Sequence, residues 1–75
     1  MAAGFVHTVY REGEWVNETE GHEGTLPGAH RTKDAAVAAG RAAAISRRTE
    51  HVIHNQDGAI GERNSYGNDP SDRPG

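Results

Sequence analysis

The alanine-rich segment from residue 33 to residue 48 constrains the fold more than any other part of the chain. Seven of its sixteen residues are alanine, which has the highest intrinsic helix propensity. Thr32 is a favourable N-cap, and Asp34 lies in the first turn, where the helix dipole stabilises negative charge. Arg47 and Arg48 lie in the last turn, where positive charge is favourable. The pattern predicts one helix from Lys33 to about Arg48.

The buried face of this helix is predicted by a stripe of small and apolar residues at helical spacing. The stripe consists of Ala36, Val37, Gly40, Ala44 and Ile45. A glycine in the middle of a helix costs about 1 kcal/mol relative to alanine. We therefore expect Gly40 to have a packing role, namely to let the helix lie close to a sheet.

The sequence on both sides of the helix is typical of β-hairpins. Residues 5–11 and 15–19 are rich in β-branched and aromatic side chains and are joined by Glu12-Gly13. Residues 51–54 and 59–66 repeat the pattern around Asn55-Gln56-Asp57-Gly58. Residues 20–31 contain three glycines and one proline and are predicted to form a loop. The predicted fold is α+β with ββαββ order: a four-stranded antiparallel sheet of two hairpins, with one helix packed on one face.

The chain is predicted to form one domain over residues 1–70, followed by a disordered tail over residues 71–75. Its core is small, because 11 of the 25 hydrophobic residues are alanine and the chain has no cysteine to form a disulfide. Such a core supplies about 3–5 kcal/mol of net stability. We therefore expect the domain to gain stability from a partner, most simply from a second copy of itself.

Charge and hydropathy narrow the class of protein. The net charge is −3, but residues 31–50 carry five basic against two acidic side chains. No apolar run approaches the roughly 18 residues that a membrane span needs. The first residues also lack the basic and apolar regions of a secretory signal. We expect a cytoplasmic protein that does not bind membranes.

The residue pattern also resembles a family of short bacterial domains of unknown function. The resemblance rests on Trp15-Val16 after the first strand, on the helix start at Thr32-Lys33, and on the stretch from Val52 to Arg63. Its most specific part is the ending Ser65-Tyr66-Gly67-Asn68-Asp69-Pro70. The resemblance covers about residues 5–70 and implies a bacterial ββαββ domain. It implies no activity and no ligand, and the longer loop at residues 20–31 departs from the family pattern.

Five histidines raise the question of a metal site. His51 and His54 are three residues apart on a predicted strand, which places them on opposite faces of the sheet. A zinc site would need His7 or His22 and a carboxylate such as Glu23 to converge from elsewhere. We expect no metal site and no cofactor.

Catalysis is also not expected. Ser65, His54 and Asp57 fall near one another across the second predicted hairpin, but a domain of this size has little room for a substrate pocket. The glycines before the helix do not form a phosphate-binding fingerprint. We expect no catalytic residues and no enzyme activity.

The sequence therefore favours a non-catalytic interaction module that forms a homodimer and binds a protein partner. Self-association is expected through a sheet edge or the alanine-rich side of the helix. The alternative is a nucleic-acid-binding accessory protein that uses the basic helix 33–48 and the aromatic residues of the sheet. The candidate interaction surface consists of Arg41, Arg47, Arg48, Tyr66 and Asn68.

Overall fold

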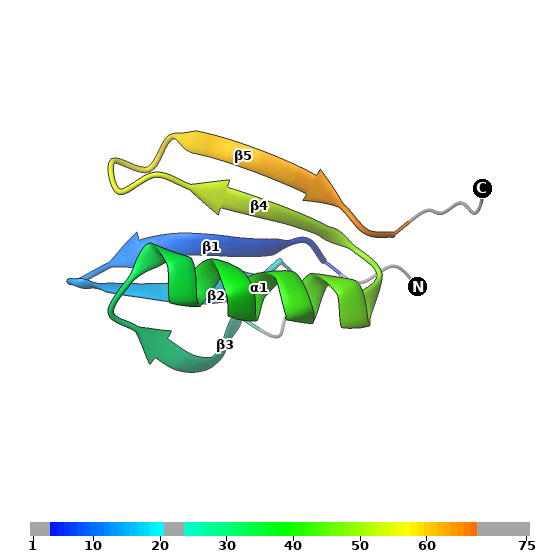
Figure 1. Ribbon diagram of the computed structural model, residues 1–75, viewed down its shortest axis with the longest axis horizontal. Helices are drawn as coiled ribbons and strands as arrows, with labels where there is room; N and C mark the ends of the chain where they lie inside the picture. The colour runs from blue at the N-terminus through cyan, green and yellow to red at the C-terminus, as the bar shows by residue number, and fades with distance from the viewer. Residues whose placement is uncertain (1–3, 21–23, 68–75) are drawn as a thin grey trace.

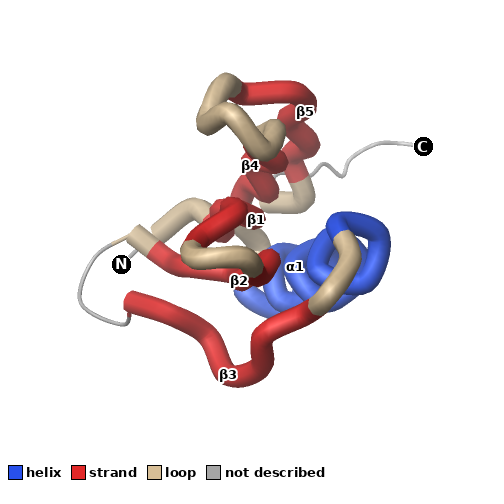
Figure 2. Tube along the Cα trace, turned by 90° about the vertical axis from the view of Figure 1, so that its left-hand side faces the viewer, coloured by secondary structure: helices blue, strands red, loops and turns tan. Residues whose placement is uncertain are grey.

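The computed structural model describes residues 4–20 and 24–67 of the chain. Five strands and one helix follow one another in the order βββαββ (Figure 1). They are β1 (Val6–Arg11), β2 (Glu14–Thr19), β3 (Gly24–His30), α1 (Lys33–Arg47), β4 (Glu50–His54) and β5 (Ile60–Ser65). The helix packs on one face of the sheet and leaves the other face uncovered (Figure 2).

The sheet has five strands in the order β3-β2-β1-β4-β5, and it is mixed. The β1–β2, β2–β3 and β4–β5 pairs are antiparallel, whereas β1 and β4 are parallel, with Val6 beside His51 and Thr8 beside Ile53. The predicted four-stranded antiparallel sheet is therefore wrong in strand number and in the orientation of the central pair. The parallel pair arises because α1 returns the chain to the starting end of β1, as in other crossover connections.

Strand β3 occupies the segment that was predicted to be a loop. An edge strand tolerates Pro27 because only one of its sides must donate backbone hydrogen bonds. Gly28 has a φ of +96°, and the register shifts between Val16 and Glu18 of the neighbouring strand. The glycines and the proline therefore mark an irregular edge strand.

Both predicted hairpins are present. Glu12 and Gly13 have positive φ values of 52° and 86° between the paired residues Arg11 and Glu14, as a two-residue connection with right-handed strand twist requires. Residues 55–59 connect β4 to β5, and Gly58 within this connection has a φ of +97°. The predicted disordered tail lies outside the described residues.

The predicted helix is confirmed over Lys33–Arg47, and Thr32 caps it by accepting a hydrogen bond from the N–H of Ala35. Ala36, Gly40 and Ala44 are buried, but Ile45 at the end of the predicted stripe is 52% exposed. Among the described residues, the buried apolar side chains are Val6, Trp15, Ala36, Ala44, Val52 and Ile53. No helix within this part of the chain is long and apolar enough to cross a membrane.

Gly40 is the point at which the helix comes closest to the sheet. A Cβ atom on Gly40 would lie 2.6 Å from Nε2 of His51 and 2.7 Å from Oγ1 of Thr8. Both distances are shorter than van der Waals contact, so any larger residue would push α1 away from the sheet. The packing role expected from the sequence is therefore confirmed.

We predict that Gly40→Ala lowers the free energy of unfolding by about 1–3 kcal/mol, although alanine is the better helix former. Urea denaturation followed by circular dichroism measures the change. Ala39→Gly is the control: Ala39 is exposed on the helix, so this variant measures the effect of helix propensity without a change in packing, about 1 kcal/mol. Stabilisation by Gly40→Ala would show that the close approach is not required.

Candidate functional site

A buried polar cluster lies between the sheet and α1, directly below Gly40. The hydroxyl of Thr8 on β1 donates to Oδ1 of Asn17 on β2 at 2.5 Å, and it lies 2.7 Å from Nε2 of His51 on β4. The side-chain amide of Asn17 donates to the backbone carbonyl of Ala36 at 3.0 Å. The cluster thereby ties β1, β2 and β4 to the helix.

The partners of His51 fix its tautomer. Because the Thr8 hydroxyl donates its only proton to Asn17, it can only accept from His51, so Nε2 of His51 carries a hydrogen. Nδ1 of His51 is then a lone-pair acceptor, and it is buried without a hydrogen-bond partner in the described structure. His51 is fully buried, and this burial, with a smaller contribution from Arg41, lowers its pKa.

The same burial predicts a pH dependence of stability. The unfolded chain has a histidine pKa of about 6.5, and the folded value is lower, so the unfolded state binds more protons below that pH. The free energy of unfolding is therefore not reduced by His51 above about pH 6.5. Below that pH it falls with acidification, by up to about 1.4 kcal/mol per pH unit. Of the charged groups around His51, Arg41 on α1 and His7 on β1 strengthen this effect, while Glu62 on β5 opposes it.

We expect urea denaturation between pH 7 and pH 5 to show this loss of stability in the unsubstituted protein. His51→Gln should be less stable at pH 7 but should have a flatter pH dependence, because it removes the titrating group. His30→Gln is the matched control and should keep the original slope. If the free energy of unfolding of His51→Gln depends on pH as steeply as that of the unsubstituted protein, the pH dependence arises from another group.

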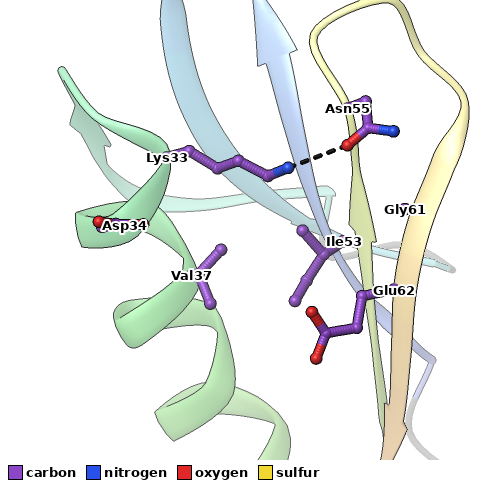
Figure 3. Close-up of a pocket in the computed structure, with 7 residues that line it drawn as sticks. All are labelled: Lys33, Asp34, Val37, Ile53, Asn55, Gly61 and Glu62. Atoms are coloured by element: carbon purple, nitrogen blue, oxygen red, sulfur yellow. Dashed lines mark hydrogen bonds between the residues drawn. The ribbon is translucent and has the colours of Figure 1, made fainter.

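A groove lies between α1 and the β4–β5 hairpin on the helix-covered side of the sheet (Figure 3). Val37 of α1 and Ile53 of β4 point toward one another, and Glu62 of β5 lies beside them. Lys33 closes one end by donating to Oδ1 of Asn55 at 3.0 Å. The cavity has a volume of about 280 Å³. It suits one large side chain better than a whole small-molecule ligand, because ligand pockets are usually about 300–1,000 Å³.

The uncovered face of the sheet carries a chain of polar contacts through two histidines. Nε2 of His7 on β1 lies 2.7 Å from the carboxylate of Glu20, and Nδ1 of His7 lies 2.9 Å from Nε2 of His54 on β4. Nδ1 of His54 lies 3.3 Å from the carbonyl oxygen of Gly58. The hydrogen bond with His7 is the main reason that the pKa of Glu20 is lowered.

The rest of that face combines paired charges with half-buried apolar residues. Arg11 forms an ion pair with Glu18, and Arg63 forms one with Glu50 at 2.8 Å. The guanidinium of Arg63 also lies 5.9 Å from the ring of Phe5. Cross-strand pairs of this kind are typical of a sheet face in contact with solvent.

Of the predicted interaction residues, Arg41, Arg47 and Arg48 lie on or directly after α1, and Tyr66 directly follows β5. Arg41 and Arg48 are exposed, whereas Arg47 is half-buried, three residues after the buried Ala44. The N–H of Tyr66 donates to the carbonyl of Thr49, so Tyr66 lies at the same end of the molecule as Arg48. Asn68 is outside the described residues.

The aromatic residues proposed to stack on nucleic-acid bases are partly occupied within the fold. Trp15 is only 7% exposed, because the ring of Tyr10 lies 5.1 Å away and Nζ of Lys33 lies 5.7 Å from its ring. A base cannot stack on Trp15 without displacing these neighbours.

Sequence reasoning separated His51 from His54 correctly, because alternation along β4 places them on opposite faces. It did not predict either cluster, since His51 meets Thr8, and His54 meets His7, only through the parallel β1–β4 pairing. The carboxylate that reaches His7 is Glu20, whereas His22 and Glu23 lie outside the described residues. The sequence signal nearest to the buried cluster was Gly40, which was predicted only to let the helix lie close to the sheet.

Comparison with known proteins places the chain in a family. Residues 6–66 match the family described as an uncharacterized protein conserved in bacteria (DUF2188). The chain belongs to this family. The match ends before Gly67, so it leaves most of the Ser65–Pro70 ending untested. No curated protein and no solved structure matches the chain.

Proposed function

We propose that this DUF2188 domain is a non-catalytic interaction module that pairs with a second copy of itself through the outer edge of β5. The observation that carries the proposal is the position of β5, which lies at the edge of the sheet and beyond the reach of the helix (Figure 2). Within residues 4–20 and 24–67, no strand pairs with its outer edge. An edge of this kind is a template for strand addition.

The two edges of the sheet differ in how well they suit pairing. The β3 edge contains Pro27, which lacks a backbone N–H, and Gly28, whose positive φ interrupts the strand. Strand β5 contains no proline, and its first residue, Ile60, is 60% exposed. Pairing through β5 therefore adds backbone hydrogen bonds that the β3 edge cannot supply.

Charges along β5 exclude two registers of such a pair. The N–H of Tyr66 donates to the carbonyl of Thr49, the residue before β4, so alternation turns the backbone groups of Arg63 away from β4 and toward a second copy. Antiparallel registers centred on Glu62 or on Arg63 would place like charges opposite each other, which is unfavourable. A register centred on Asn64 avoids this and places Glu62 of one copy opposite Tyr66 of the other.

This register also supplies an occupant for the groove in Figure 3. Residues 62, 64 and 66 alternate onto the helix-covered side of the sheet, where Glu62 lines the groove. The Tyr66 side chain of the second copy then lies at the groove mouth, with its ring near Val37 and Ile53 and its hydroxyl near Glu62. The groove volume of about 280 Å³ matches one aromatic side chain.

The pairing is short, so we expect a weak, concentration-dependent dimer. We predict that sedimentation equilibrium over roughly 10 μM to 1 mM detects dimers of the unsubstituted protein. Arg63→Pro should leave only monomer, because proline removes the outward N–H that the second strand requires. Circular dichroism checks that this variant stays folded.

Arg63→Ala is the matched control, because it removes the ion pair with Glu50 but keeps the backbone N–H. This variant should still dimerise. Tyr66→Ala should weaken the dimer without abolishing it, since it removes the groove occupant and keeps the strand pairing. Monomer alone throughout the concentration range for the unsubstituted protein would contradict the proposal.

Nucleic-acid binding through Arg41, Arg47 and Arg48 stays the second prediction. Arg41 and Arg48 are exposed and available to phosphates, but the half-buried position of Arg47 and the burial of Trp15 reduce the surface available. Because phosphate neutralisation makes such binding strongly salt-dependent, loss of binding in high salt would identify it.

A further inference from the structure

The contact between His7 and His54 is the middle one of three hydrogen bonds on the uncovered face of the sheet. Nε2 of His7 lies 2.7 Å from the ionised carboxylate of Glu20, which can only accept, so this nitrogen carries a hydrogen. Nδ1 of His54 lies 3.3 Å from the carbonyl oxygen of Gly58, which also can only accept, so this nitrogen carries a hydrogen as well. Between the rings, Nδ1 of His7 and Nε2 of His54 are 2.9 Å apart, and one of them must donate to the other.

These three bonds need more hydrogens than two neutral rings supply. They place a hydrogen on three of the four ring nitrogens, whereas two neutral imidazoles carry one hydrogen each. The complete set of contacts therefore belongs to a state in which the two histidines together hold one extra proton. The charge of this proton has a counter-ion in Glu20, whose pKa is lowered mainly by its hydrogen bond with His7.

We propose that His7 and His54 form a pH-sensitive histidine bridge, which joins β1 to the β4–β5 turn while the pair holds a single extra proton. The bridge makes the order of this turn depend on pH in the range where histidine titrates, at about pH 6.5. It lies within one copy of the chain, so it does not depend on the proposed self-association.

A second proton breaks the histidine bridge. Both rings then carry hydrogens on both nitrogens, so the two facing nitrogens are both donors and neither accepts. Two like charges in contact also repel each other. A hollow of about 280 Å³ beside His54, lined also by Val9 and Arg11, gives the ring of His54 space to turn away from β1.

Loss of the extra proton loosens the histidine bridge at a different point. Two hydrogens serve only two of the three contacts, and we expect the longest contact, between His54 and Gly58, to be lost. The two rings then stay in contact, but the β4–β5 turn is no longer bonded to the His54 side chain. The turn is therefore held most firmly at intermediate pH.

The surrounding charges leave Glu20 as the counter-ion of the histidine bridge. Among the described residues, the other carboxylates near the two rings on this face form ion pairs with arginines of neighbouring strands: Glu18 with Arg11, and Glu50 with Arg63. In the turn, the carboxylate of Asp57 accepts a hydrogen bond from the N–H of Ala59. His51 lies on the opposite face of β4, under the helix.

Imidazole ¹⁵N NMR of the full chain at pH 5, pH 6.5 and pH 8 tests the proposal. At pH 6.5 we expect a scalar coupling between Nδ1 of His7 and Nε2 of His54 across their shared hydrogen, together with a hydrogen on Nδ1 of His54. At pH 5 the coupling should be lost. At pH 8 the coupling should persist, but Nδ1 of His54 should lose its hydrogen. Backbone order parameters of residues 55–59 should be highest at pH 6.5.

Three variants separate the histidine bridge from other titrating groups. Glu20→Gln keeps an acceptor for His7 but removes the counter-charge, so the hydrogen on Nδ1 of His54 should be lost at a lower pH than in the unsubstituted protein. His7→Gln should abolish both the coupling and the pH dependence of the order parameters. His30→Gln is the matched control and should leave both unchanged.

Circular dichroism checks that each variant is folded, and the measurements on the unsubstituted protein test the proposal without any substitution. Absence of the coupling at pH 6.5 would overturn the proposal. A coupling and order parameters that are the same at pH 5 and pH 6.5 would overturn it as well, because the second proton would then leave the contact intact.

Discussion

The close contact between Gly40 and the buried Thr8–Asn17–His51 cluster sets the position of the helix on the sheet. Buried polar groups are costly unless they are paired, and here Thr8 and Asn17 are satisfied by one another and by the backbone of α1. Only a helix that carries glycine at this point can lie close enough for Asn17 to reach Ala36. The small set of buried apolar side chains then suffices because the polar cluster adds directional contacts between the layers.

The placement of α1 determines which parts of the sheet stay uncovered. The helix packs over β1 to β4 and leaves β5 at the edge, so the groove opens between the helix and β5. Alternation along β1 and β4 sends Thr8 and His51 into the core and His7 and His54 to the opposite face. The buried cluster and the His7–His54 pair therefore lie on opposite faces of the same parallel strand pair. Only the face under the helix is shielded from solvent.

Local patterns predicted the helix, both hairpins and the opposite faces of His51 and His54, because each depends on residues close in sequence. The mixed sheet was not predicted, since no local signal shows that β4 joins β1 in parallel across α1. Strand β3 was not predicted because its glycines and proline are typical of loops. A strand can contain them here because β3 lies at the edge of the sheet and pairs on one side only. Ile45 was predicted to be buried, but it lies in the last turn of the helix and is 52% exposed. The contacts of His51 with Thr8 and of His54 with His7 follow from the parallel pairing and were beyond local reasoning for the same reason.

The most direct test of this account is the protonation state of His51, measured by ¹⁵N NMR of the imidazole ring at pH 7. The account predicts a neutral ring with hydrogen on Nε2, a scalar or nuclear Overhauser connection to Thr8, and slow exchange of that hydrogen with solvent. A charged ring, a hydrogen on Nδ1, or rapid exchange would contradict it, because each requires a different arrangement beneath Gly40.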